Sequence, residues 1–129
     1  MARGLIQATA ARSGTAIIVD GNSCIVRSND ISKSGKHGAS KCRIEAIGIL
    51  DDKKRVIAVP GHERFEIPMI DKRKGQILSI GEKASLMDLE SFETLENVQL
   101  DDDVKGKLKE GDQVEYWNIE GRKIIKRTS

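Results

Sequence analysis

The segment SKSGKHGASK, residues 32–41, has the residue types and spacing best suited to chemistry. It carries three lysines and one histidine, and it has no aliphatic side chain larger than alanine. Lys36 lies between Gly35 and the pair His37-Gly38. Flanking glycines allow crowded backbone conformations and leave room for another molecule to approach. These residues predict an exposed loop that presents Lys36 as a long, flexible cation; an ordinary polar loop, with glycines only for turning, is the alternative.

Positive charge is concentrated around this loop. Residues 1–70 hold eleven Lys or Arg against seven Asp or Glu, a net charge of +4, whereas residues 71–129 hold eleven against thirteen, a net charge of −2. A local positive field favours a polyanionic partner such as nucleic acid, although a solvated polar surface has the same composition. Asp30 is the one acid near the group of basic residues, which are Arg27, Lys33, Lys36, Lys41 and Arg43.

The sequence lacks the spacing of two common sites, the phosphate-binding P-loop and the nucleophilic serine motif. A phosphate-binding P-loop needs a glycine five residues before its Gly-Lys pair and a Ser or Thr after the lysine. The pair Gly35-Lys36 has Asp30 at the first position and His37 at the second. The chain also lacks Gly-x-Ser-x-Gly, a motif that presents a nucleophilic serine. We therefore expect no nucleotide site and no catalytic residue.

The histidines and cysteines do not suggest a metal site. No two of His37, His62, Cys24 and Cys42 stand at a recognisable ligand spacing, and His62 is expected in a turn or on the surface. Single cysteines without a Cys-x-x-Cys motif indicate reduced thiols in a cytosolic protein. No apolar run approaches the roughly 20 residues of a membrane span, and the N-terminus does not resemble a secretory signal. A cytoplasmic protein without membrane contact is expected.

Short alternating apolar runs predict strands throughout the first half of the chain. In TAIIVDGNSCIVRS, two apolar runs flank Asp20-Gly21, a pair typical of a two-residue hairpin turn because glycine accepts a positive φ. Further strands are predicted from CRIEAIGIL, RVIAV and RFEIPMI. Residues 1–69 are therefore expected to form five or six strands of a small β-barrel, with Phe65 in its core.

A second domain is predicted after the polar segment DKRKGQ, residues 71–76, where we place the domain boundary. QILSI, ASLMDLESFETLENVQL and DQVEYWNIEGRKIIKR supply about five strands. In DDDVKGKLKEG, acids at the start, lysines toward the end and the final glycine predict a short helix over about 102–109. Three strands, a helix and two strands follow the order of the oligonucleotide-binding (OB) fold.

Aromatic side chains are too few for a platform of stacked bases. The chain has Phe65, Phe92, Tyr116 and Trp117. Tyr116 and Trp117 are neighbours in one predicted strand, so one of the two is expected to point inward. Contacts with nucleic acid are therefore expected at the sugar-phosphate backbone rather than through stacking.

The loop closely resembles the hypusine loop of the translation initiation factor 5A family of archaea and eukaryotes, which is related to bacterial elongation factor P. IIVDGNSCIV resembles that family's first hairpin, AIGIL the strand after the loop, FEIPMIDKRKGQIL the interdomain segment and MDLESFETLE the second domain. The resemblance covers nearly the whole chain. Where eukaryotic members have His-Ala-Lys, this chain has Ala39-Ser40-Lys41, a difference that we attribute to an archaeal lineage.

The resemblance implies both a fold and a modification. The fold is mainly all-β, with an SH3-like barrel at residues 1–70 and an OB-fold domain with one short helix at residues 71–129. Deoxyhypusine synthase would transfer a 4-aminobutyl group from spermidine to Lys36, and in eukaryotes a hydroxylase completes hypusine. The other loop residues that would contact the ribosome and tRNA are Lys33, Ser34, Gly35, His37, Gly38 and Lys41.

By the same resemblance, the protein is a translation factor that binds the ribosome and ribosomal RNA. It would direct the modified loop at the acceptor end of the P-site peptidyl-tRNA and promote peptide bond formation at stalled sequences such as proline runs. It would act as a monomer and by positioning, not as an enzyme, with no cofactor beyond the covalent modification. The alternative hypothesis is a two-barrel RNA-binding or RNA-processing protein that works without lysine modification.

Overall fold

The computed structural model describes the backbone of residues 3–34 and 39–129. The chain forms two compact units, Met1–Pro68 and Met69–Ser129. Four of the residues singled out above lie outside the described residues: Gly35, Lys36, His37 and Gly38.

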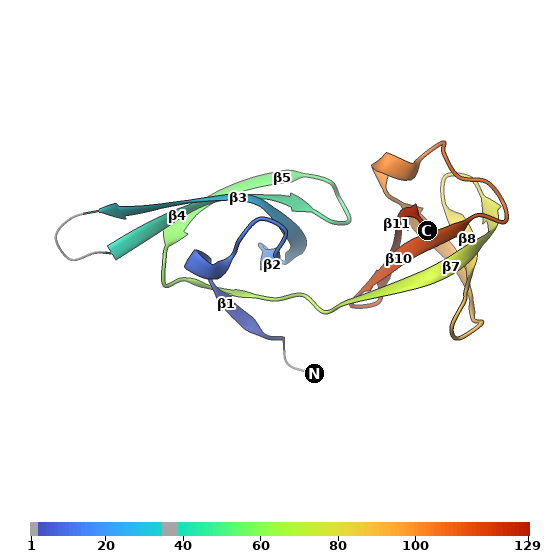
Figure 1. The fold of residues 1–129 in the computed structure, drawn as a ribbon, viewed down its shortest axis with the longest axis horizontal. Coiled ribbons are helices and arrows are strands. Elements are labelled where there is room, and N and C mark those ends of the chain that lie inside the picture. Colours follow the sequence, from blue (N-terminus) through green and yellow to red (C-terminus); the bar gives the residue numbers. More distant parts are fainter. Residues whose placement is uncertain (1–2, 35–38) are drawn as a thin grey trace. The chain divides into compact units, whose positions relative to one another are not determined.

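The first unit consists mainly of antiparallel strands (Figure 1). Strands β2, β3, β4 and β5 form one sheet in that order, and β1 pairs with β6 in a second, two-stranded sheet. The unit contains six strands, in agreement with the five or six that the sequence predicts. In chain order the elements are β1 (Leu5–Gln7), the 3-10 helix η1 (Ala8–Ala10), β2 (Ala16–Val19), β3 (Asn22–Ser34), β4 (Ala39–Gly48), β5 (Lys54–Pro60) and β6 (Arg64–Glu66).

The turn between β2 and β3 has the geometry that the sequence predicts. Asp20 and Gly21 both take a positive φ, 50° and 79°, which is the conformation of a type I′ turn. The strands on either side alternate buried and half-buried side chains, and Phe65 packs half-buried against the core. The core of this unit comprises Ala8, Ala11, Ile17, Val19, Cys24, Val26, Cys42, Ile44 and Ala46.

The second unit is a closed barrel with the strand order β10-β11-β9-β8-β7, as predicted for an OB fold. The barrel closes through the parallel pair of β11 with β9, while its other neighbouring strands are antiparallel. Residues 71–76, where the sequence places a boundary, lie within its first strand. Its elements are β7 (Ile70–Ile80), β8 (Ala84–Asp88), β9 (Thr94–Leu100), the 3-10 helix η2 (Asp102–Val104), β10 (Gln113–Ile119) and β11 (Arg122–Thr128).

The helix of the second unit is shorter than the predicted span of about 102–109. Only Asp102–Val104 are helical, in the 3-10 form. Asp101 caps this turn, since its side chain accepts a hydrogen bond from the backbone N–H of Asp103 at 3.3 Å. The helix does not continue because Lys105 (φ −58°, ψ 130°) and Gly106 (φ +76°) form a type II turn, which is closed by the hydrogen bond from Lys107 N–H to the Val104 carbonyl at 3.1 Å.

Tyr116 and Trp117 are both buried, which differs from the expectation for neighbours on a strand. Tyr116 belongs to the barrel core. Trp117 lies outside that core cluster and is instead covered by two ammonium groups: Lys72 Nζ lies 4.6 Å and Lys126 Nζ 5.1 Å from its ring centroid. Cation–π contacts of this kind bury an aromatic ring without placing it in the core. Neither ring is available as a stacking platform.

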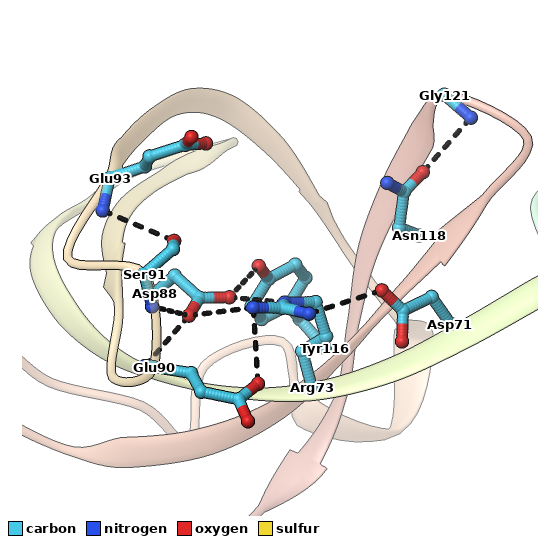
Figure 2. A network of polar contacts seen from close by, with 9 residues as sticks. All are labelled: Asp71, Arg73, Asp88, Glu90, Ser91, Glu93, Tyr116, Asn118 and Gly121. Atoms are coloured by element: carbon cyan, nitrogen blue, oxygen red, sulfur yellow. Dashed lines mark hydrogen bonds and ion pairs between the residues drawn. The ribbon is translucent and has the colours of Figure 1, made fainter.

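In the barrel of the second unit, a buried carboxylate accepts hydrogen bonds from several donors (Figure 2). Asp88, 1% exposed, accepts hydrogen bonds from Arg73 Nε at 2.5 Å and from the hydroxyl of Tyr116 through Oδ2. Its Oδ1 accepts from Arg73 Nη2 at 3.2 Å and from the backbone N–H groups of Glu90 and Ser91 at 2.8 Å each. The donors that face this carboxylate thus come from β7, from β10 and from the loop after β8.

These contacts set the charge states in the network. Hydrogen bonds from Arg73, followed by those from Tyr116 and the loop amides, hold the pKa of Asp88 well below its usual range. Burial, together with the adjacent carboxylate, raises the pKa of Tyr116 to about 12, so its hydroxyl remains a donor at neutral pH. The network is therefore an ion pair with a protonated phenol bound to it.

The first prediction concerns the stability contributed by Asp88. We expect Asp88→Asn to lower the free energy of unfolding at pH 7 by about 3 kcal/mol, since it leaves the buried side of Arg73 without its charged partner. The folded pKa of Asp88 is depressed, so its contribution is present above the unfolded pKa of about 3.9 and is lost as pH falls below that value. Urea unfolding of both proteins between pH 7 and pH 3 measures the difference.

Asp71→Asn provides the matched control for this prediction. Asp71 is exposed and pairs with Arg73 Nη1 at 3.2 Å, so its loss should lower the free energy of unfolding by about 1 kcal/mol or less. Equal losses in the two variants, or a difference between wild type and Asp88→Asn that does not shrink in acid, would contradict the assignment.

Candidate functional site

The β3–β4 hairpin carries the loop that the sequence singles out. Its ladder begins at the pair Cys24↔Gly48 and continues to Ser34↔Ala39. β5 pairs with β4 as far as Lys41↔Pro60, and in Figure 1 the two hairpin strands continue past β5. The segment 35–38, which contains Lys36, joins the two paired ends. The last described pair of the hairpin, Ser34↔Ala39, thus borders the segment that contains Lys36 and lies two pairs beyond the end of the β4–β5 ladder at Lys41.

The exposure of the side chains changes along this hairpin. Near the sheet they alternate, with Cys24, Val26, Cys42 and Ile44 buried. In the outer part β3 has four consecutive exposed residues, which run from Asp30 to Lys33. The facing strand still packs, since Cys42 opposite Ile31 belongs to the core. The outer end of β3 does not pack into the core, and its backbone pairing with β4 holds it in an extended form.

Two lysines give the outer hairpin a positive charge on each face. Lys33 pairs with Ser40 and Lys41 pairs with Ser32. Directly opposed residues share a face and successive residues alternate, so Lys33 and Lys41 lie on opposite faces. Both are exposed, and neither forms an ion pair within the described part of the chain. Their charges are available to an external anion.

Charge is balanced closer to the sheet. Glu45 on β4 accepts from Ser28 Oγ at 3.2 Å and forms ion pairs with Lys54 Nζ at 3.2 Å and Arg43 Nη1 at 3.5 Å. Hydrogen bonds from Lys54 and Ser28, together with the neighbouring positive charges, lower the pKa of Glu45. The cations beside Glu45 are therefore paired, whereas Lys33 and Lys41 at the outer end are not paired with any described residue.

Asn29 braces the hairpin where it leaves the core, a role that the sequence did not indicate. Its Nδ2 donates to the carbonyl of Ala8 at 2.7 Å and to that of Ala11 at 3.0 Å. Both carbonyls belong to the turn around η1, so this side chain ties that turn to β3. An asparagine in a polar stretch carries no pattern that reveals such a contact.

Gly61 forms a second brace on the β4 side. Its N–H donates to the carbonyl of Ser40 at 2.8 Å, and its own carbonyl accepts from the N–H of Thr9 at 3.3 Å. A Cβ added at Gly61 would lie 2.1 Å from Ser40 Oγ and 2.9 Å from Thr9 Cγ2. Only glycine allows this close approach, and the Pro60-Gly61 pair suggested a turn but not this packing.

The structure places the predicted site residues as follows. Lys33 and Lys41 are exposed on the outer hairpin, and Ser34 ends the β3 ladder opposite Ala39. Gly35, Lys36, His37 and Gly38 lie outside the described residues, so their roles stay predictions. His62, expected in a turn or on the surface, is exposed.

Within residues 3–34 and 39–129, no group of three or more His, Cys, Asp or Glu side chains is arranged to hold a metal ion. None of the helices in this part of the chain is long and apolar enough to cross a membrane. Both cysteines are buried free thiols, and burial raises the pKa of each.

Comparison with known proteins identifies the family. A family model described as "Translation initiation factor 5A-like, N-terminal" matches residues 4–62, and one described as "Eukaryotic elongation factor 5A hypusine, DNA-binding OB fold" matches residues 69–128. Translation initiation factor 5A of Thermococcus kodakarensis is 44% identical over 126 residues, covering 95% of this chain and 93% of that protein. The chain belongs to the translation initiation factor 5A family.

Other members agree in sequence and in structure. Translation initiation factor 5A of Methanosphaera stadtmanae is 41% identical and covers 99% of this chain and 97% of that protein. The solved structure of the factor from Methanococcus jannaschii has a TM-score of 0.88 at 33% identity and covers 99% of this chain and 96% of that one. These findings confirm the resemblance and show that the chain is a member of a family of translation factors.

The second prediction tests the brace at Gly61. We expect Gly61→Ala to lower the free energy of unfolding by about 1–3 kcal/mol, because the new methyl group overlaps the Ser40 side chain. Ser40→Ala should restore part of this loss in the double variant, since it removes the nearest atom. Denaturant unfolding of the two single variants and the double variant gives the coupling free energy.

Gly4→Ala is the matched control in the same unit. A Cβ at Gly4 would meet Ile67 Cδ1 at 3.5 Å, which is an ordinary contact, so we expect a change within about 0.5 kcal/mol. Additive effects of Gly61→Ala and Ser40→Ala would show that the two positions are not packed as described.

Proposed function

We propose that this member of the family acts on the ribosome through Lys36 carrying a deoxyhypusine or hypusine side chain. The modified residue is directed at the acceptor end of the P-site peptidyl-tRNA, where it promotes peptide bond formation at stalled sequences. Deoxyhypusine synthase, which uses NAD, transfers the aminobutyl group of spermidine to the Lys36 amine and releases 1,3-diaminopropane. The factor itself requires no further cofactor.

One observation carries this proposal: the segment that contains Lys36 joins the ends of an exposed and braced hairpin. Such a ribbon is narrow, so it suits insertion between large partners. The exposed Lys33 and Lys41 next to the segment favour an RNA partner, because phosphate groups attract cations on either face. Ser34, Gly35, His37 and Gly38 complete the proposed contact surface.

The modification changes the reach and charge of the lysine. Adding an aminobutyl group to Nζ gives a longer arm with a secondary amine and a terminal primary amine, both protonated at neutral pH. Such an arm can donate hydrogen bonds to phosphate and ribose oxygens without reading a base sequence. The factor contributes orientation of the bound tRNA, which lowers the entropic barrier to reaction, and no group of its own takes part in bond making.

The proposal places the protein in the cytoplasm as a monomeric, non-enzymatic partner of the ribosome. It requires that a modifying enzyme reach the Lys36 amine first, and the outer hairpin offers access because its side chains from Asp30 to Lys33 are exposed. The same exposure then serves contact with RNA.

The third prediction concerns Lys36 itself. Mass spectrometry of the protein coexpressed with deoxyhypusine synthase and supplied with spermidine should show the mass of one aminobutyl group, confined to the peptide that contains Lys36. Lys36→Arg keeps the positive charge but lacks the primary amine, so it should remain unmodified and should lose the stimulation of Pro-Pro bond formation in a reconstituted translation system.

Lys33→Arg is the matched control, since it keeps the charge of a neighbouring exposed residue and leaves Lys36 intact. We expect this variant to be modified and to retain most of the stimulation. Equal stimulation by Lys36→Arg, or by wild-type protein that was never modified, would favour an RNA-binding protein that works without lysine modification.

A further inference from the structure

The loop between β8 and β9 presents an aromatic side chain to solvent. Phe92 is 71% exposed, more than any other large apolar residue in the described part of the chain. It lies in the second unit, outside the hairpin that carries the proposed Lys36 site. An exposed ring adds nothing to the core of the barrel.

The backbone around Phe92 is fixed from both sides. The N–H of Phe92 donates to the carbonyl of Asp88 at 2.9 Å, and the N–H of Asp88 donates to the carbonyl of Glu93 at 2.8 Å. The buried Asp88 carboxylate also accepts from the amides of Glu90 and Ser91 (Figure 2). A ring carried by such a constrained loop loses less backbone freedom on binding than one on a flexible loop.

The backbone conformation at residue 92 is unfavourable for an aromatic residue. Phe92 has a φ of +61°, in the left-handed region where glycine and asparagine are favoured. Folding alone would favour glycine here, because glycine would relieve the backbone and remove an exposed apolar surface. The presence of phenylalanine therefore calls for a contact that folding does not supply.

The residues near Phe92 in sequence are acidic. Residues 89–97 include Glu90, Glu93 and Glu96, all exposed, and no Lys or Arg. Arg73 is bound to Asp88 and reaches Glu90 at 3.2 Å, and Lys74 borders the loop, since its carbonyl accepts from Leu89 N–H. Even when these two cations are counted, the three glutamates and Asp88 give the loop a net negative charge. This surface repels nucleic acid and attracts a cationic partner.

We propose that Phe92, with Glu90, Glu93 and Glu96, forms a docking point for a Lys/Arg-rich segment of a protein partner. A guanidinium or ammonium group lies over the ring face, where the ring quadrupole attracts it. The glutamates pair with neighbouring basic side chains and set the orientation of the segment. Binding here does not depend on the modification of Lys36.

The fourth prediction tests this docking point on the full chain. The probe is a short synthetic peptide of alternating arginine and glycine, titrated into isotope-labelled protein while amide chemical shifts are followed by NMR. We expect the largest shifts at residues 89–96 and about fivefold weaker binding for Phe92→Gly, which corresponds to the loss of a cation–π contact. Phe92→Tyr and the control Leu78→Ala, another exposed apolar residue of the same unit, should bind like wild type.

Phe92→Gly also separates binding from folding. Because it relieves the positive φ, its thermal midpoint should equal or exceed that of wild type while its affinity falls. Phe92→Asn should give the same combination. Loss of both stability and affinity in the two variants would overturn the proposal, since the ring would then serve the fold.

Three further results would overturn it. Equal affinity of Phe92→Gly and wild type would show that the ring is not used. An oligouridine that shifts the amides of residues 89–96 more strongly than the peptide would indicate an RNA surface. Sedimentation that reveals Phe92-dependent self-association without peptide would assign the surface to a second copy of the chain. None of these results bears on Lys36, whose modification is measured separately by mass.

Discussion

The backbone pairing of β3 with β4 is the interaction on which the candidate site depends. A chain segment outside the core must satisfy its peptide groups, and here the ladder from Cys24↔Gly48 to Ser34↔Ala39 provides partners within the ribbon. The exposed side chains at the outer end of the hairpin need not pack into the core, so they can be polar and cationic. A two-stranded ribbon alone is marginally stable in water, so the contacts of Asn29 and Gly61 at its base determine whether it holds its direction.

Charge is distributed so that the two units favour different partners. The first seventy residues carry a net +4 and the remainder a net −2, yet the whole chain is close to neutral. A uniformly basic protein would bind RNA in many orientations. With the positive charge exposed at Lys33 and Lys41 and the acidic loop on the other unit, RNA is attracted to one place and repelled from another. Each unit then responds differently to a large anionic partner before any close contact forms.

Local signals made much of the fold predictable. The Asp20-Gly21 turn depends only on its own two backbone conformations, and the alternating runs describe strands with one buried face. Sequence-based predictions were wrong where the structure depends on residues distant in sequence or on single backbone angles. The turn at Lys105 and Gly106 ends η2 early, and Trp117 is covered by Lys72 and Lys126, which are remote in sequence. The loop sequence indicated the site itself, whereas its braces depend on tertiary approach, for which no local pattern exists.

The buried charge at Asp88 is better understood as a conformational constraint than as a source of stability. A buried ion pair is often no more stabilising than apolar residues of the same volume. An apolar replacement of Asp88, however, would leave the amides of Glu90 and Ser91 without an acceptor. Those two amides define the path of the loop that carries Phe92. The buried carboxylate thus fixes the backbone path of an exposed loop. Hydrophobic packing could not do this, because it is non-directional.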